Sequence, residues 1–182
     1  MQTKQNFTNL AMNLLRSYPT QGEIKLKSGV RLPDRKTIDR ALDDLMCVFF
    51  PGSHGQAPST SKALQRLIES LLKKSLSDLV QQATHAFKYQ CTAEKCLKCN
   101  DCKKKAAQAV ADFEKSIPDI QKILHRDIQA AYEGDPAARS TMEVVVSYPC
   151  VFAIVAQRVA HIFYELHVPL IPRMMTECAH SR

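Results

Sequence analysis

The sequence has no tryptophan and only five glycines among 182 residues. A chain this poor in glycine has few positions for the tight turns of β-hairpins, which disfavours a sheet-rich fold. No apolar run reaches the roughly 18–20 residues of a membrane-spanning helix, so we expect no membrane partner. The first residues, MQTKQNFTNLAMNLL, show no charged leader followed by a long apolar core, which favours a cytoplasmic protein.

The residues that are present are typical of a soluble helical protein. Hydrophobic residues make up 45% and charged residues 24% of the sequence, which argues against global disorder. The length suits one ordinary domain, so we expect a single helical domain over 1–182. Its expected parts are an N-terminal helix with a connector (1–31), a helical hairpin (32–90), a cysteine-rich segment (91–102) and further helices (103–182).

Apolar residues recur every three or four positions, which predicts a mostly α fold, a multi-helix bundle with no sizeable sheet. The periodic stretches predict helices at about 4–17, 33–50, 61–89, 106–116, 118–132, 149–166 and 170–180. Ser116-Ile117-Pro118 is interpreted as a helix start, because proline is favoured in a first turn. Residues 140–147 are rich in β-branched side chains, and their type stays open.

The net charge of +7 raises the question of nucleic-acid binding. Much of the excess lies near the cysteine-rich segment, in Lys88, Lys95, Lys98, Lys103, Lys104 and Lys105. We see no Arg-rich helix and no alternation of basic and aromatic residues, so a solvated helix face is preferred and no nucleic-acid partner is expected. A basic patch that attracts an anion such as a nucleotide is the alternative.

Four cysteines form the strongest local pattern in the chain. Cys91, Cys96, Cys99 and Cys102 follow the spacing C-x4-C-x2-C-x2-C. Four thiolates converging on one centre suit a tetrahedral zinc site or an iron–sulfur cluster, and the neighbouring lysines favour thiolates. Alternatively, one continuous helix would place the last three cysteines in a half-buried stripe without a metal. Both interpretations stay open.

The other cysteines and the histidines carry weaker signals. Cys47, Cys150 and Cys178 lie in apolar surroundings and are expected to be small core residues. His161 is flanked by apolar residues, which favours a hydrogen-bonded core or interface histidine over a ligand. His180 matches no catalytic spacing.

Asp127 and Asp135 are eight residues apart, which would place both near one face of a continuous helix. Gly134 is expected to end that helix at the C′ position, so a pair of catalytic carboxylates is only weakly indicated. The residues alone therefore do not favour an enzyme as the first interpretation.

Three stretches carry a resemblance to a known enzyme family. They are LPDRKTIDRALDDL followed by FFPG, IPDIQKILHRDIQAAYEGDPAARS, and SYPCVFAIVAQRVAHIFYELHVPLIPRMMTECAHSR. They resemble the helical N-terminal domain of serine acetyltransferases, from about Leu32 to Arg182. The resemblance implies helices that lead to a left-handed β-helix of hexapeptide repeats, and the sequence stops where that β-helix is expected.

The resemblance implies serine O-acetyltransferase activity, in which acetyl-CoA and L-serine give O-acetyl-L-serine and CoA during cysteine biosynthesis. In the family, a β-helix histidine oriented by an aspartate removes the serine hydroxyl proton, and CoA lies along the β-helix. Asp135, in the sequence GDP, matches the family's acidic residue that holds the serine ammonium, and no catalytic residue is expected within this chain. The helical domain is also implied to assemble homo-oligomers, as trimers or hexamers.

Two further interpretations stand beside the enzyme family. One is a non-catalytic helical module that binds zinc or an iron–sulfur cluster through Cys91, Cys96, Cys99 and Cys102. The other is a helical oligomerisation module alone. Because the family's catalytic pair and CoA groove belong to the β-helix, we expect the 182-residue chain to be a truncated form that is inactive alone.

Overall fold

The structure is a computed structural model that describes residues 2–17, 30–53, 58–93 and 101–181. These residues form seven helices and no strand, which confirms the mostly α prediction. They divide into two units, Met1–Val30 and Arg31–Arg182. The first unit contains helix α1 (Gln2–Ser17), in which Phe7 and Leu15 are exposed. One domain over 1–182 stays a prediction.

Helix α2 (Arg35–Phe49) begins at a side-chain cap, two residues after Pro33. Oδ2 of Asp34 accepts hydrogen bonds from the backbone N–H and the hydroxyl of Thr37, at 2.9 and 2.6 Å. The backbone N–H of Asp34 donates to Oε1 of Gln82 at 2.7 Å, and Gln82 is only 3% exposed. This bond ties the start of α2 to the middle of helix α3 (Ser61–Ala93).

Helix α3 begins after Thr60, whose hydroxyl oxygen accepts a hydrogen bond from the backbone N–H of Ala63 at 3.2 Å. It runs four residues past the expected end near Tyr89. Its buried face is marked by residues spaced three or four apart, as the periodicity predicts. They are Ser75, Leu79, Gln82, Ala83 and Ala86.

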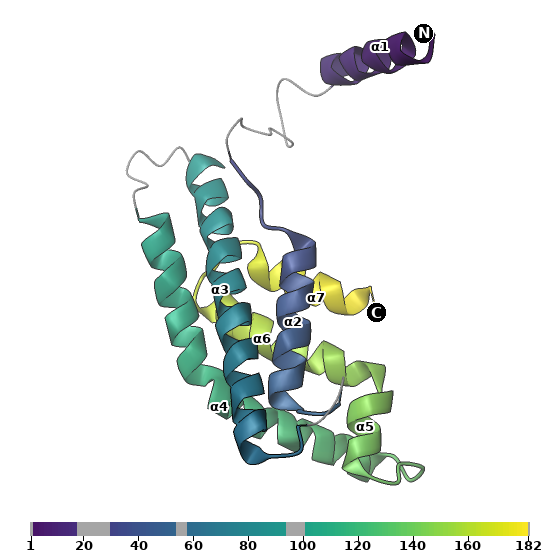
Figure 1. Ribbon diagram of the computed structural model, residues 1–182, viewed down its shortest axis with the longest axis vertical. Helices are drawn as coiled ribbons and strands as arrows, with labels where there is room; N and C mark the ends of the chain where they lie inside the picture. The colour runs from purple at the N-terminus through teal and green to yellow at the C-terminus, as the bar shows by residue number, and fades with distance from the viewer. Residues whose placement is uncertain (1, 18–29, 54–57, 94–100, 182) are drawn as a thin grey trace. The chain divides into compact units, whose positions relative to one another are not determined.

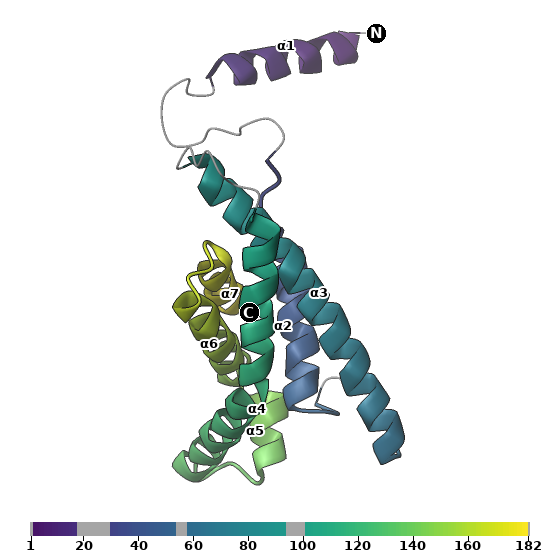
Figure 2. The same ribbon diagram turned by 90° about the vertical axis from the view of Figure 1, so that its left-hand side faces the viewer.

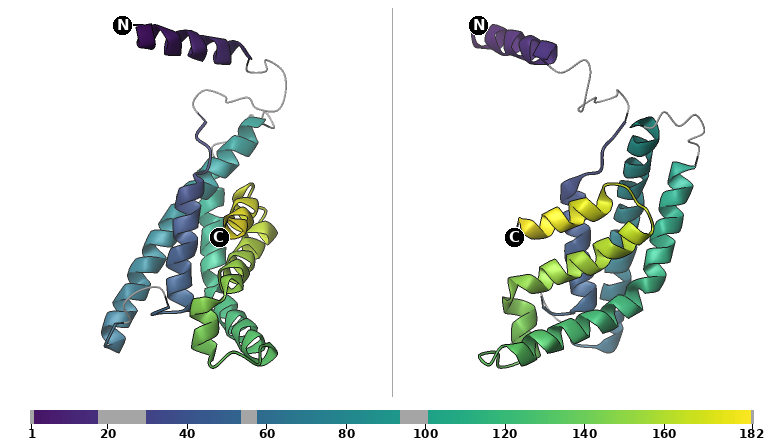
Figure 3. Two further views of the ribbon diagram at one scale, coloured as in Figure 1. Left: turned by 90° about the vertical axis from the view of Figure 1, so that its right-hand side faces the viewer. Right: turned by 180° about the vertical axis from the view of Figure 1, so that it is seen from behind.

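Helix α4 (Cys102–Gly134) continues through Pro118, so the prediction of two separate helices at 106–116 and 118–132 is wrong. Proline has no backbone N–H to donate to the carbonyl of Glu114, and its ring crowds that carbonyl. Such a position bends a helix, and Figure 3 shows the second half of α4 turning away from the first. Phe113 and Ile120 are both buried, so packing on each side of the proline favours one bent helix over two.

The short segment whose type the sequence leaves open is helix α5 (Thr141–Ser147). Oγ of Ser140 accepts a hydrogen bond from the backbone N–H of Glu143 at 3.1 Å. The Glu143 carboxylate accepts one from the backbone N–H of Arg139 at 2.8 Å, so the arrangement is close to a capping box. These cap bonds stabilise the first turn of α5, whereas its β-branched residues have a low tendency to form a helix.

Helices α6 (Pro149–Glu165) and α7 (Ile171–His180) form an antiparallel pair. Their connection ends in a tight turn in which the backbone N–H of Ile171 donates to the carbonyl of Pro169 at 2.7 Å, with Leu170 at φ 64°. No single helix among the described residues is long and apolar enough to cross a membrane. Helices α5 and α6 reach that threshold only together, as a pair bent by 82°.

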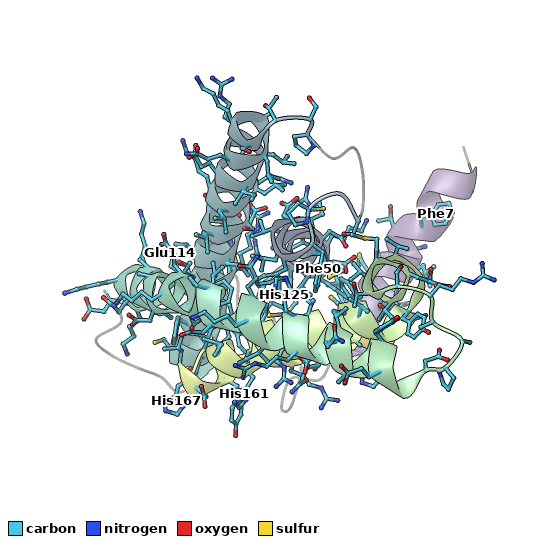
Figure 4. All side chains as sticks on the ribbon, turned by 90° about the horizontal axis from the view of Figure 1, so that it is seen from below. Phe7, Phe50, Glu114, His125, His161 and His167 are labelled. Atoms are coloured by element: carbon cyan, nitrogen blue, oxygen red, sulfur yellow. The ribbon has the colours of Figure 1, made fainter. Side chains whose placement is uncertain are left out.

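Helices α2 to α7 share one hydrophobic core. In Figures 1 and 2, α2, α3 and the first half of α4 run side by side, and α6 and α7 cross them. Phe113 of α4 and Phe163 of α6 are fully buried, with ring centroids 4.8 Å apart. Phe50, after α2, lies beside His125 of α4 at 6.2 Å between ring centroids (Figure 4). The bundle thus fixes α4, which precedes the loop described next, against α6.

Candidate functional site

Asp135 lies in the loop between α4 and α5, directly after the last helical residue, Gly134. The predicted end of the helix at this point is confirmed, although Gly134 is the last helical residue and not a left-handed C′ residue. Oδ1 of Asp135 accepts a hydrogen bond from the backbone N–H of Ala137 at 2.9 Å. The backbone carbonyl of Asp135 accepts one from Ala138 at 3.0 Å. This is an Asx-type turn, in which the aspartate holds the loop that it occupies.

Tyr148, between α5 and α6, completes the setting of Asp135. Its hydroxyl donates a short hydrogen bond to Oδ2 of the carboxylate. This bond, followed by the one from Ala137, lowers the pKa of Asp135 below its ordinary value. The same bond raises the pKa of Tyr148 to about 12. Asp135 is therefore a carboxylate, and Tyr148 a neutral donor, throughout the neutral pH range.

The carboxylate of Asp135 has capacity beyond these two bonds. Its two oxygens offer about four lone-pair positions, of which Ala137 and Tyr148 occupy two. The residue is half-buried, so part of the carboxylate stays open to solvent. A fixed and partly exposed anion of this kind can bind an ammonium group by a charge-assisted hydrogen bond.

Asp127 does not join Asp135 in a carboxylate pair. Its two oxygens accept bonds from Nε and Nη2 of Arg158 at 3.0 and 2.9 Å, in a fork that ties α4 to α6. This pairing raises the pKa of Arg158. A surface pocket of about 640 Å³ lies beside the pair, and Cys150 and His180 are among its lining residues. The Asp127–Arg158 pair is therefore a structural link at the edge of a pocket.

The four-cysteine site is described only in part, because Cys96 and Cys99 lie outside the described residues. Cys91 lies near the end of α3 and Cys102 begins α4, with their Sγ atoms 3.5 Å apart. Cys102 is disulfide-bonded. Within the described residues, no group of three or more His, Cys, Asp or Glu side chains is placed to hold a metal ion. The zinc or iron–sulfur prediction therefore has no support from this part of the chain.

The isolated cysteines and His161 differ from their predicted settings. Cys178 is buried as expected, at 1% exposure, and Cys47 is intermediate, whereas Cys150 is exposed, so its assignment to the core is wrong. The core alternative is also wrong for His161, whose side chain is 58% exposed and lies 3.3 Å from Glu165. Figure 4 shows His161 pointing away from the bundle. Both residues lie on the outer face of α6, where the apolar neighbours in sequence turn inward.

Two residues of this region were not singled out by the sequence. Tyr148 is separated from Asp135 by 13 positions and Arg158 from Asp127 by 31. The dipeptide Tyr148-Pro149 at the start of α6 does not indicate that the tyrosine hydroxyl donates to an aspartate. A single arginine in an apolar helix, such as Arg158, indicates an acidic partner only weakly. Both pairings depend on how α6 packs against α4.

Comparisons with known proteins agree on one enzyme class. No family model matches the sequence. The plasmid serine acetyltransferase of Synechococcus elongatus is 31% identical over 152 residues, 82% of this chain and 48% of the relative. A second serine acetyltransferase of that organism is 44% identical over 55 residues, 30% of this chain and 22% of the relative. The chain thus spans about half the length of the first of these relatives.

Solved structures show the same likeness in fold. Serine acetyltransferase 1 of Entamoeba histolytica in complex with L-cysteine superposes with a TM-score of 0.63 and 24% identity, over 100% of this chain and 60% of that one. The native form of the same enzyme gives a TM-score of 0.55 and 25% identity, over 95% and 58%. The matched part of these enzymes is their N-terminal region.

Proposed function

The chain is a homologue of the serine acetyltransferases over about half of their length, and we propose that it supplies the helical part of such an enzyme. The reaction is the transfer of an acetyl group from acetyl-CoA to the hydroxyl of L-serine, which gives O-acetyl-L-serine and CoA for cysteine synthesis. In this proposal, Asp135 binds the ammonium group of L-serine, and the groups that move protons and hold acetyl-CoA come from the β-helix of the family.

The observation that carries the proposal is the setting of Asp135. A substrate ammonium is bound best by a carboxylate that is already charged and already oriented, because little is then lost in ordering it. The turn at Ala137 and the hydroxyl of Tyr148 supply both conditions. The Asp127–Arg158 fork and the Phe113–Phe163 contact hold α4, which precedes Asp135, against α6, which follows Tyr148. Asp135 therefore acts by binding and orienting serine, not by moving a proton.

A chimaera tests whether these residues can replace the helical part of an active enzyme. Residues 1–182 are joined to the remaining half of the Synechococcus elongatus plasmid enzyme, and CoA release is measured with acetyl-CoA and L-serine. We expect turnover that depends on both substrates in the chimaera. We expect no turnover above background in the 182-residue chain, because the family's catalytic histidine belongs to the β-helix.

The cyanobacterial enzyme itself is the positive control, and the helical content by circular dichroism shows that each protein is folded. A folded chimaera without acetyl transfer would contradict the proposal. So would serine-dependent CoA release by the 182-residue chain alone.

We also propose that the chain forms homo-oligomers, as trimers or hexamers, through its helices. Support comes from apolar side chains that are exposed on α5, α6 and the start of α7. They are Met142, Val146, Tyr164 and Leu170. Exposed apolar side chains of this size would be covered from water in such an assembly. Light scattering after gel filtration is expected to give a multiple of 20.5 kDa, and a monomer at every concentration would contradict it.

A further inference from the structure

Arg35, the first residue of α2, contacts the end of α7. Its Nη2 donates to the backbone carbonyl of Glu177 at 3.1 Å and to Oγ of Ser181 at 2.9 Å. These partners are 142 and 146 positions away in the sequence. Helix α7 packs against α2, and Figure 1 shows it beside the first half of that helix. Neither contact takes part in the binding of serine proposed above.

The contact with Glu177 satisfies a carbonyl at the end of α7. The last four carbonyls of an α-helix have no partner within the helix, and Glu177 provides one of the four in α7. Arginine side chains can bond such carbonyls, and their charge is favourable at the negative end of the helix dipole. The carboxylate of Glu177 pairs with Arg173 at 2.7 Å. Arg35 therefore acts on the backbone of α7 and not on the charge of the glutamate.

The backbone of Arg35 is held by the core. The preceding residue, Asp34, caps α2 through Thr37, and its backbone N–H donates to the buried Gln82 of α3 at 2.7 Å. The guanidinium therefore extends from a backbone that α2 and α3 fix together. In α7, by contrast, Cys178 is the last buried residue, so the turn that follows it lies outside the core.

Ser181 connects Arg35 to that last turn. The backbone N–H and the hydroxyl of Ser181 both donate to the carbonyl of Cys178, at 3.3 and 2.8 Å. The same hydroxyl oxygen accepts the bond from Arg35. Arg35, Ser181 and the carbonyls of Glu177 and Cys178 thus form one connected set of hydrogen bonds. This set fixes the direction of the chain where α7 ends.

We propose that Arg35 is a positioning residue that sets the direction in which the chain leaves α7 toward the catalytic β-helix. This inference rests on the function proposed above, in which the β-helix follows α7 and Asp135 holds the serine ammonium. The serine hydroxyl then has to meet the histidine of the β-helix, so the angle between bundle and β-helix sets that distance. A displacement of about 1 Å can lower a reaction rate by roughly 100-fold.

Arg35→Gln in the active chimaera tests this role, with CoA release as the measurement and Arg40→Gln as the matched control. Arg40 is another exposed arginine of α2, and it donates to Thr37 of its own helix at 3.0 Å. We expect Arg35→Gln to lower kcat/KM for serine by about tenfold or more, because the hydroxyl is displaced from the histidine. The KM for acetyl-CoA and the Tm should stay unchanged, since the family's CoA site belongs to the β-helix and Arg35 is exposed. Arg35→Lys, which keeps a charged donor, should recover part of the loss.

Combination with Asp135→Asn separates positioning from a general loss of structure. Without the ammonium contact, the bundle no longer determines where serine lies, so Arg35→Gln should have little further effect on kcat/KM for serine. Equal losses with and without the Asp135 carboxylate would overturn the proposal. So would a loss in Arg35→Gln that comes with a higher KM for acetyl-CoA and a lower Tm.

Hydrogen exchange in the 182-residue chain tests the contact without enzyme activity. Arg35→Gln should speed exchange at the backbone amides of residues 178–181 by about threefold or more and leave residues 174–176 unchanged. Exchange at 178–181 that equals that of Arg40→Gln would contradict the contact. A folded chimaera without activity would contradict the function proposed above and this inference with it. An active chimaera that Arg35→Gln does not impair would contradict the role of Arg35 alone.

Discussion

Asp135 keeps its charge because the backbone N–H of Ala137 and the hydroxyl of Tyr148 both donate to it. The GDP sequence identifies Asp135 by resemblance, but its spacing from other acidic residues does not. Tyr148 could not be predicted, because its approach depends on the turn after Gly134 and on the direction of α5. At the scale of single residues, the sequence therefore indicates the anion but not the group that orients it.

The bond between Asp135 and Tyr148 is expected to appear in the titration of tyrosine. In Asp135→Asn the phenol loses its charged acceptor, so the pKa of Tyr148 should fall from about 12 toward the ordinary value of 10.0. Tyrosinate absorbance follows the change, with Tyr148→Phe to identify the signal and Tyr164→Phe as an exposed control. An unchanged titration in Asp135→Asn would show that the bond does not form in solution.

The same shift has a consequence for stability. The folded-state pKa of Tyr148 is raised, so the bond stabilises the fold fully below pH 10 and its contribution is lost as the pH rises toward 12. For Asp135 the folded-state pKa is lowered, so its contribution is present above the ordinary value of 3.8 and is lost in more acidic solution.

At the scale of helices, the sequence predicts the strongly periodic elements well and the exceptions poorly. The apolar spacing of α2, α3 and α6 leads to bounds within a few residues of those observed. The prediction of a helix start at Pro118 is wrong, because it considers only the preference of proline for a first helical turn. Phe113 and Ile120, on either side of Pro118, are both buried, and their packing keeps α4 continuous. The core positions predicted for Cys150 and His161 are wrong, because apolar neighbours in the sequence do not show which face of α6 is exposed.

Helix α5 depends on its cap more than on its own residues. It has seven residues, three of them valine, and so has little intrinsic tendency to be helical. Ser140→Ala removes the side-chain acceptor for Glu143 and is expected to lower the free energy of unfolding by about 1 kcal/mol. Urea denaturation measures the loss. Ser147→Ala, at the exposed far end of α5, should change stability much less, and equal effects of the two variants would contradict the role of the cap.

At the scale of the whole molecule, the packing of the core explains how the side chain of a loop residue, Asp135, is held in one position. α4 and α6 meet at Phe113 and Phe163 in the centre and at Asp127 and Arg158 on the surface. Asp135 follows the end of α4, and Tyr148 precedes α6. The packing of the two helices therefore sets the position of the carboxylate relative to its donor. The bundle thus supports the carboxylate that we propose to bind the substrate ammonium.

The most direct test of this account is the Michaelis constant for L-serine in the active chimaera with Asp135→Asn. Loss of the ammonium contact should raise the KM for serine by roughly tenfold or more and leave the KM for acetyl-CoA unchanged. Asp119→Asn is the matched control, because that exposed aspartate of α4 pairs only with Lys122 among the described contacts. A serine KM in Asp135→Asn that equals the KM of the control would contradict the account.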